Sequence, residues 1–133
     1  VNTAIAPALR EYAHAAIDIS DGLHADLQHI CKASHISADI YTDTIPLSPA
    51  CATLLRKGEL TWADIVSGGD DYKLLLAVPD DTLSPFMEAA RTQGLNSAVI
   101  GQFIDAAEHE PAVTIHDSNG GRCEVMQSGW RHF

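Results

Sequence analysis

The chain has 133 residues, a length that allows one domain with a substantial core and is short for a two-domain enzyme. Its 18 acidic and 8 basic side chains give a formal net charge of -10, which repels the phosphate backbone of nucleic acids and anionic lipid surfaces. We therefore expect no nucleic-acid or membrane partner, and any phosphate that the domain handles must be reached through metal ions.

The opening "VNTAIAPALREY" has neither the basic start of a signal peptide nor the long apolar run of a membrane span. We therefore expect a cytoplasmic protein that folds as a single domain over residues 1–133. Three cysteines without a CxxC pair indicate reduced thiols, and seven histidines without an HxxxH pair give no basis for predicting a zinc site.

The first half of the chain reads as alternating strands and helices. An apolar run gives way to Leu23, Leu27 and Ile30, which recur at helical spacing. Ser48 before Pro49 is a typical helix start, and Thr61 with Asp64 resembles a capping box. The elements predicted here are a short buried strand at 16–19, a helix at 23–34, a strand at 38–41, a helix at 49–57 and a short helix that ends near residue 66.

The second half continues the alternation. Ser84 and Pro85 repeat the cap-then-proline start of a helix, and Gly94 ends it. In "DSNGG", Asn119 and Gly120 suit positive φ and predict a hairpin turn between antiparallel strands. The elements predicted here are strands at 72–78, 99–104, 112–116 and 123–126 and a helix that begins at 84–85. The whole pattern predicts an α+β fold, in which helices cover a mixed β-sheet.

Two carboxylates bracket a serine in "DISDG", where the first strand meets the first helix. Ser20 or Asp21 could cap the N–H groups at the helix start, but capping leaves Asp18 without a role. A carboxylate inside an apolar strand costs free energy unless a partner neutralises it, and Mg²⁺ bound by one or two carboxylates would do so. Capping and a magnesium site both remain open on spacing alone.

A second acidic segment, "SGGDDY", carries Asp70 and Asp71 after two glycines. Taken alone it is typical of a helix end followed by a turn, and it matches neither a Walker A loop nor a dinucleotide-binding fingerprint. Because both acidic segments adjoin predicted strands, one edge of a sheet could bring them together. Near the C-terminus, Trp130 either packs on the core or stacks on a flat ligand ring.

Five stretches carry a family resemblance: "AIDISDGLHADLQHICKAS", "IPLSPA", "SGGDDYKLLLAVP", "IGQF" and "GWRHF". In their order and spacing they resemble the carboxyl-terminal half of the bacterial thiamine-monophosphate kinases, within the aminoimidazole-ribonucleotide-synthetase-like superfamily. The resemblance implies a C-terminal domain of that type, and ATP-dependent phosphorylation of thiamine monophosphate to thiamine diphosphate with Mg²⁺ in the cytoplasm.

The resemblance also implies roles for single residues. Asp18 and Asp21 match Mg²⁺ ligands and Ser20 a nucleotide contact, and two further positions, Asp70 and Trp130, match contacts to the thiamine substrate. Asp70 stands where the family usually has Glu. The nucleophile is a phosphate oxygen that is already largely ionised, so the resemblance calls for no strong general base and we name no catalytic residue.

The resemblance covers one half of a kinase. It implies that the N-terminal half of the same protein is a partner, that the full-length protein is a homodimer, and that the isolated domain is inactive. Two alternatives stay open: another ATP-dependent enzyme of the superfamily, of the selenophosphate or purine-biosynthesis type, or a non-catalytic module that binds metal or nucleotide.

Overall fold

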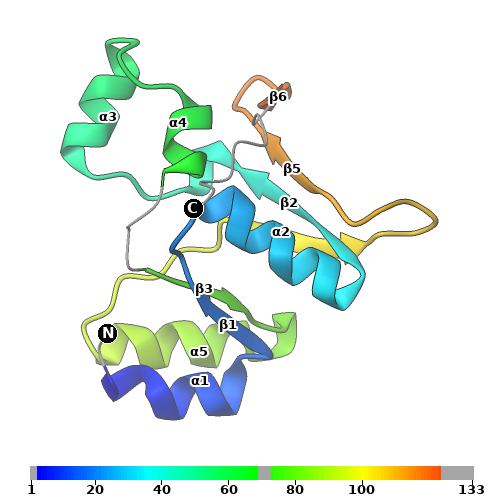
Figure 1. Ribbon diagram of the computed structural model, residues 1–133. Coiled ribbons are helices and arrows are strands. Elements are labelled where there is room, and N and C mark those ends of the chain that lie inside the picture. The colour runs from blue at the N-terminus through cyan, green and yellow to red at the C-terminus, as the bar shows by residue number, and fades with distance from the viewer. Residues whose placement is uncertain (1–2, 69–72, 124–133) are drawn as a thin grey trace, which may run out of the picture. The chain divides into compact units, whose positions relative to one another are not determined.

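The computed structural model describes residues 3–68 and 73–123 (Figure 1). The chain divides into two compact units. Unit 1 consists of Val1–Ile19 and Tyr72–Ser97, and unit 2 consists of Ser20–Asp71 and Ala98–Phe133. None of the helices in the two described ranges has the length and apolar character that crossing a membrane requires.

Unit 1 combines two short strands with two helices. Its elements are η1 (Thr3–Ile5), α1 (Ala6–Tyr12), β1 (Ala15–Asp18), β3 (Leu74–Ala77) and α5 (Asp80–Thr92). β1 and β3 are antiparallel, with Ala15 opposite Ala77 and Asp18 opposite Leu74. The pairing joins segments that lie more than fifty residues apart in the sequence, so unit 1 depends on contacts that no local pattern encodes.

The core of unit 1 lies where α1 packs against α5. Ile5 and Ala8 are buried against Phe86 and Ala90 of α5, and Leu76 of β3 packs on this cluster. Burial of a side chain such as Phe86, which is 4% exposed, contributes roughly 1.5–3 kcal/mol. The sequence patterns predict neither η1 nor α1, although Ile5 of η1 and Ala8 of α1 supply two of the four buried residues of this cluster.

β1 is not the buried strand that the sequence predicts. Ala15, Ala16 and Asp18 are exposed, and Ile17 is half-buried. The cause is the small sheet: β1 has one partner strand, and it is β3 that contributes side chains to the described core cluster.

The start of α5 also differs from the prediction. The helix begins at Asp80 after Pro79, so Pro85 lies inside the helix rather than at its start. Asp80 and Asp81 occupy the first turn, where negative charge is stabilised by the helix dipole. The Oγ1 atom of Thr82 donates to the carbonyl oxygen of Tyr12 at 3.2 Å, which ties this first turn to the end of α1. These contacts outweigh the cap signal of Ser84 and Pro85.

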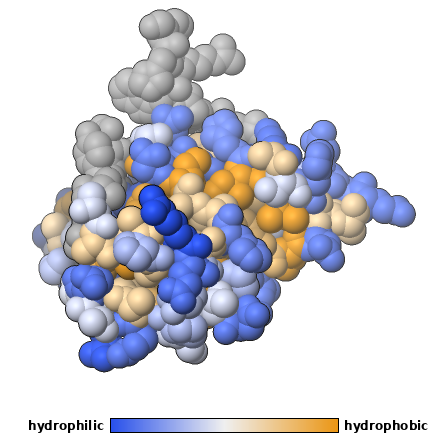
Figure 2. Space-filling view, turned by 90° about the horizontal axis from the view of Figure 1, so that it is seen from below, coloured by the Kyte–Doolittle hydropathy of each residue, from blue (hydrophilic) through white to orange (hydrophobic). Residues whose placement is uncertain are grey.

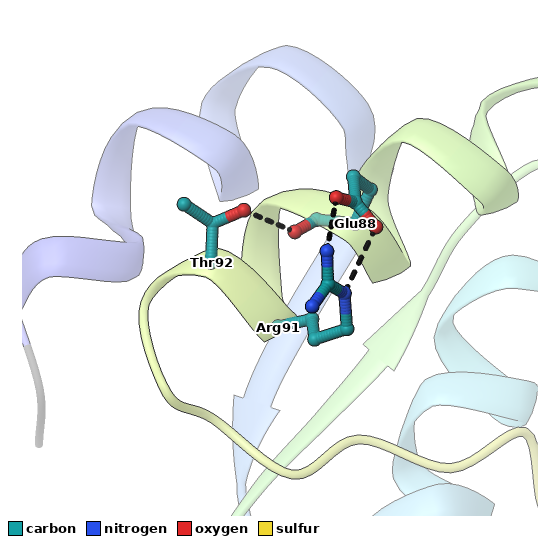
Figure 3. Close-up of polar contacts among 3 residues, drawn as sticks. All are labelled: Glu88, Arg91 and Thr92. Atoms are coloured by element: carbon teal, nitrogen blue, oxygen red, sulfur yellow. Dashed lines mark hydrogen bonds and ion pairs between the residues drawn. The ribbon is translucent and has the colours of Figure 1, made fainter.

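Near the end of α5, Arg91 and Glu88 form a bidentate ion pair (Figure 3). The Nη2 and Nε atoms of Arg91 donate to the two carboxylate oxygens of Glu88 at 2.6 and 3.0 Å, and Thr92 Oγ1 donates to the carbonyl oxygen of Glu88 at 2.9 Å. The Arg91 guanidinium lowers the pKa of Glu88. Because both side chains are largely exposed, the pair contributes little to stability.

Unit 2 is built on a four-stranded mixed sheet. Its elements are α2 (Leu23–Ser34), β2 (Ile36–Tyr41), η2 (Thr42–Thr44), α3 (Pro49–Arg56), α4 (Trp62–Ser67), β4 (Gly101–Asp105), β5 (Val113–His116) and β6 (Arg122–Cys123). The strand order is β4-β2-β5-β6, in which β2 and β5 are parallel and the other two pairs antiparallel. The predicted α+β fold with a mixed sheet and helices is therefore confirmed.

The core of unit 2 forms where α2 contacts β2 and β5 (Figure 1). Leu27 and Cys31 of α2 are buried, as are Ile40 of β2 and Ile115 of β5. α2 also contacts α4, whose Val66 has no exposed surface. The apolar stripe of α2 therefore fixes the helix on the sheet and presents its N-terminal end beside α4.

Polar side chains join β2 and β5 on their other face. His116 Nε2 lies 2.9 Å from Asp39 Oδ1, and the His116 ring stacks on Tyr41 with centroids 5.2 Å apart. Tyr41 remains exposed. More generally, the face of the molecule drawn in Figure 2 carries apolar residues, in orange, among polar residues, in blue. The contacts of His116 with Asp39 and Tyr41 thus link β5 to β2, two parallel strands that no hairpin connects.

Three local predictions are confirmed. Ser48 Oγ accepts from the Cys51 N–H at 3.2 Å at the start of α3, and Thr61 and Asp64 form a complete capping box before α4. The antiparallel pairing of β5 and β6 places a turn at 117–121, where Gly120 has φ of 79°. Asn119 does not have the predicted positive φ. Its N–H donates to Asp117 Oδ1, and in this turn Gly120 is the residue with positive φ.

Candidate functional site

Asp18, the first predicted metal ligand, is the last residue of β1. It is exposed, so the reasoning that an apolar strand buries this carboxylate is wrong. Asp18 therefore needs no neutralising partner to be stable. An exposed carboxylate at a strand end is nevertheless open to a cation from solvent.

Neither Ser20 nor Asp21 caps α2, which removes the simplest explanation of the "DISDG" motif. The N-cap residue is Gly22, with φ of 117° and no side-chain cap hydrogen bond. The Ser20 side chain is exposed and that of Asp21 is half-buried. The N-cap position of α2 is thus occupied by glycine and not by Ser20 or Asp21.

A buried carboxylate holds the backbone of these two residues. Asp26, in the first turn of α2, is 3% exposed. Its Oδ2 atom accepts the N–H of Ser20 at 2.8 Å and the N–H of Asp21 at 3.0 Å. Asp26 is not part of the "DISDG" motif, although its spacing is a signal: three residues after Leu23 and one before Leu27, it falls on the buried stripe of α2.

Gly22 brings the start of α2 against the end of α4. A Cβ atom on Gly22 would lie 2.8 Å from the carbonyl oxygen of Ser67, closer than such atoms approach in folded proteins. Ser67 is the first residue of "SGGDDY". Within unit 2, "DISDG" therefore adjoins the start of the second acidic segment.

The other end of the second segment adjoins the first segment within unit 1. The Ile19 N–H donates to the carbonyl oxygen of Lys73 at 2.8 Å, and Asp18 lies opposite Leu74 in the β1–β3 register. The flanks of the two acidic segments are thus neighbours, as their positions beside strands predict. Asp70 and Trp130, the predicted substrate contacts, lie outside the described residues.

The described carboxylates fit magnesium better than zinc. No group of three His, Cys, Asp or Glu side chains in residues 3–68 and 73–123 is placed to hold a metal ion. Mg²⁺ requires fewer protein ligands, because it takes one or two carboxylates and completes its octahedron with water and substrate phosphates. Asp18 and Asp21 offer oxygens of that kind, whereas Asp26 Oδ2 is taken by two N–H groups.

His24, in the first turn of α2, is a histidine whose pKa is shifted by the fold. Burial lowers its pKa, and a hydrogen bond with the backbone of Val113 opposes that shift. Folding therefore disfavours the protonated imidazole of His24 relative to that of a fully solvated histidine. His24 links the first turn of α2 to β5, the strand on which that helix packs.

Comparison with known proteins gives a consistent result. The model of the family described as "AIR synthase related protein, C-terminal domain" matches residues 1–114. The thiamine-monophosphate kinase of Salmonella typhimurium is 43% identical over 96 residues, 71% of this chain and 29% of that protein. The thiamine-monophosphate kinase of Caulobacter vibrioides is 38% identical over 104 residues, 74% of this chain and 29% of that protein.

A solved structure of AaThiL complexed with AMPPCP and TMP is similar in both sequence and fold. It is 30% identical, with a TM-score of 0.67 over 94% of this chain and 35% of that chain. The chain thus spans about a third of the length of these three proteins.

Proposed function

Since this chain belongs to the family of AIR synthase related C-terminal domains, we propose that it is the carboxyl-terminal part of a thiamine-monophosphate kinase. The full-length enzyme transfers the γ-phosphoryl group of ATP to a phosphate oxygen of thiamine monophosphate, which yields thiamine diphosphate and ADP. The observation that carries the proposal is that "DISDG" and "SGGDDY", the segments by which the chain resembles these kinases, have adjoining flanks. The relatives that share the name and the AaThiL complex with an ATP analogue support it.

The exposed end of β1 and the start of α2 hold the groups that the reaction needs. In this proposal Asp18 and Asp21 hold Mg²⁺, and Ser20 contacts the nucleotide. Mg²⁺, when bound, neutralises phosphate charge that builds up during transfer. The backbone of Ser20 and Asp21 is fixed before any ligand arrives, because Asp26 accepts both N–H groups. Fixed positioning is what phosphoryl transfer chiefly requires of a protein.

Asp70 and Trp130 contact the thiamine substrate in the same proposal. These two contacts are proposed because "SGGDDY" and "GWRHF" resemble segments of the kinases. Asp70 and Trp130 themselves lie outside the described ranges. Asp70 supplies a carboxylate and Trp130 an aromatic face, which suit a cationic ring system.

The remainder of the enzyme supplies what this chain lacks. The chain spans 29% of each of the two curated kinases above. We therefore propose that the N-terminal half of the same protein completes the nucleotide site, that the full-length protein acts as a homodimer in the cytoplasm, and that this chain alone is inactive.

A kinase assay on the full-length protein tests the proposal. Thiamine monophosphate, ATP and Mg²⁺ should yield thiamine diphosphate, and removal of Mg²⁺ by a chelator should abolish the product. Transfer to another phosphorylated acceptor, with none to thiamine monophosphate, would instead favour a different enzyme of the superfamily. ATP binding with no transfer to any acceptor would favour a non-catalytic module.

A further inference from the structure

We infer that Asp26 is a positioning residue: its buried carboxylate fixes the backbone from which Ser20 and Asp21 reach the nucleotide and its metal ion. The inference rests on the proposed function for the roles of Ser20 and Asp21. The contacts that carry it are those of unit 2 alone. Asp26 is buried and bonded to the backbone of these two residues, so in this inference it acts through them and not on the ligand itself.

The burial of Asp26 shows that its hydrogen bonds matter. A carboxylate that is 3% exposed is costly unless hydrogen bonds satisfy it. Asp26 Oδ2 accepts two backbone N–H groups at 2.8 and 3.0 Å, lengths at which bonds to a charged acceptor are strong. Removing the carboxylate would leave both N–H groups without this acceptor.

The two bonds hold consecutive residues, and this sets the direction of their side chains. With the N–H groups of Ser20 and Asp21 both directed at one oxygen atom, rotation of the intervening peptide is restricted. The next residue, Gly22, packs so closely against Ser67 that an added Cβ atom would lie 2.8 Å from the Ser67 carbonyl oxygen. The loop is thus held from both sides, by a carboxylate at one end and by α4 at the other.

A second aspartate in unit 2 also accepts two backbone N–H groups with one carboxylate oxygen, away from this loop and in a more exposed place. Asp117 Oδ1 accepts the N–H groups of Asn119 and Gly121, each at 2.8 Å, in the turn between β5 and β6. Asp117 therefore provides a matched control. Its loss removes two backbone-to-carboxylate hydrogen bonds without touching the segment that carries Ser20 and Asp21.

The test compares Asp26→Ala, Asp26→Asn and Asp117→Ala in the full-length enzyme. For Asp26→Ala we expect the KM for ATP and the Mg²⁺ concentration at half-maximal rate to rise by about 10–100-fold, as for other residues that orient metal ligands. The KM for thiamine monophosphate should change less. Asp26→Asn should recover most of the loss, because its side-chain carbonyl oxygen accepts the same two N–H groups. Asp117→Ala should leave all three constants unchanged.

Hydrogen exchange of the peptide that spans residues 18–27, measured in the same proteins, separates this inference from the proposed function. Faster exchange of the Ser20 and Asp21 amides in Asp26→Ala, but not in Asp117→Ala, is expected whatever the enzyme phosphorylates. Unchanged exchange at these amides would overturn the inference even if the kinase assay succeeds. Equal losses of thermal stability in the two alanine variants, with unchanged ATP and Mg²⁺ dependence, would also overturn it, since Asp26 would then only stabilise the fold.

Discussion

The backbone of Gly22 lies so close to the carbonyl oxygen of Ser67 that no side chain fits between them. Gly22 also has φ of 117°, a conformation that other residues adopt only with strain. The start of α2 and the end of α4 therefore meet at a point that requires glycine.

Substitution Gly22→Ala should destabilise the protein by roughly 1–3 kcal/mol through steric overlap, in addition to the backbone strain. The midpoint of urea unfolding measures the loss. Gly58→Ala is the matched control, because Gly58 also has positive φ, 74°, but has no atom within 4 Å of the added methyl group. An equal shift in the two variants would show that the approach to Ser67 is not restrictive.

Asp18→Asn in the full-length enzyme should lower kcat by about 100-fold or more, because it weakens the stabilisation of transition-state charge. The melting temperature should stay unchanged, since Asp18 is exposed at the end of its strand. Asp105→Asn serves as the control, because Asp105 is likewise the exposed last residue of a strand. Normal activity of Asp18→Asn at limiting Mg²⁺ would contradict the ligand assignment.

Trp130→Ala should raise the KM for thiamine monophosphate by roughly 2–10-fold, the effect of losing one aromatic stacking contact. The KM for ATP should move less, because the proposed partner of Trp130 is the thiamine ring. Trp130→Phe should retain most of the affinity. Equal increases for both substrates in Trp130→Ala would point to packing of the chain terminus instead of stacking.

Stability should fall in mild acid because of His24. Burial lowers the pKa of His24 in the fold, so near its ordinary pKa of about 6.5 the unfolded chain binds more protons than the folded one. Its contribution is therefore complete above that pH and is lost as the pH falls through the lowered pKa.

Urea unfolding at pH 8 and in steps down to pH 5 measures this dependence. His24→Gln should flatten the pH dependence. His29→Gln, which changes an exposed histidine on the same helix, should not. A pH profile that is identical for the wild type and His24→Gln would assign the acid sensitivity to other groups.

Local sequence signals predict the elements whose ends are set by neighbouring residues. The bounds of α2 follow from its apolar spacing, and the starts of α3 and α4 follow from the caps at Ser48 and Thr61. Each of these features involves residues within about one helical turn. The same signals fail for α5, where a contact between Thr82 and Tyr12 helps to fix a start that the Ser84–Pro85 pair does not mark.

The exposure of Asp18 and the role of Asp26 follow from tertiary structure. Asp18 looks buried in sequence because apolar residues precede it, but β1 has one partner strand and little cover. Asp26 falls on the buried stripe of α2, which indicates burial, but its two partners become visible only when the preceding loop folds back onto it. The motif "DISDG" thus identifies the segment of the candidate site, whereas Asp26, which holds the backbone of that segment, lies outside the motif.

The division into units has a practical consequence for anyone who wishes to dissect or label the molecule. The chain passes from one unit to the other at residues 19–20, 71–72 and 97–98, so each unit is assembled from two separate stretches. No single truncation can yield either unit on its own, because each truncated chain would also carry part of the other unit. A fluorophore or affinity tag is better inserted into the exposed connection at 107–110, which leaves every crossover untouched.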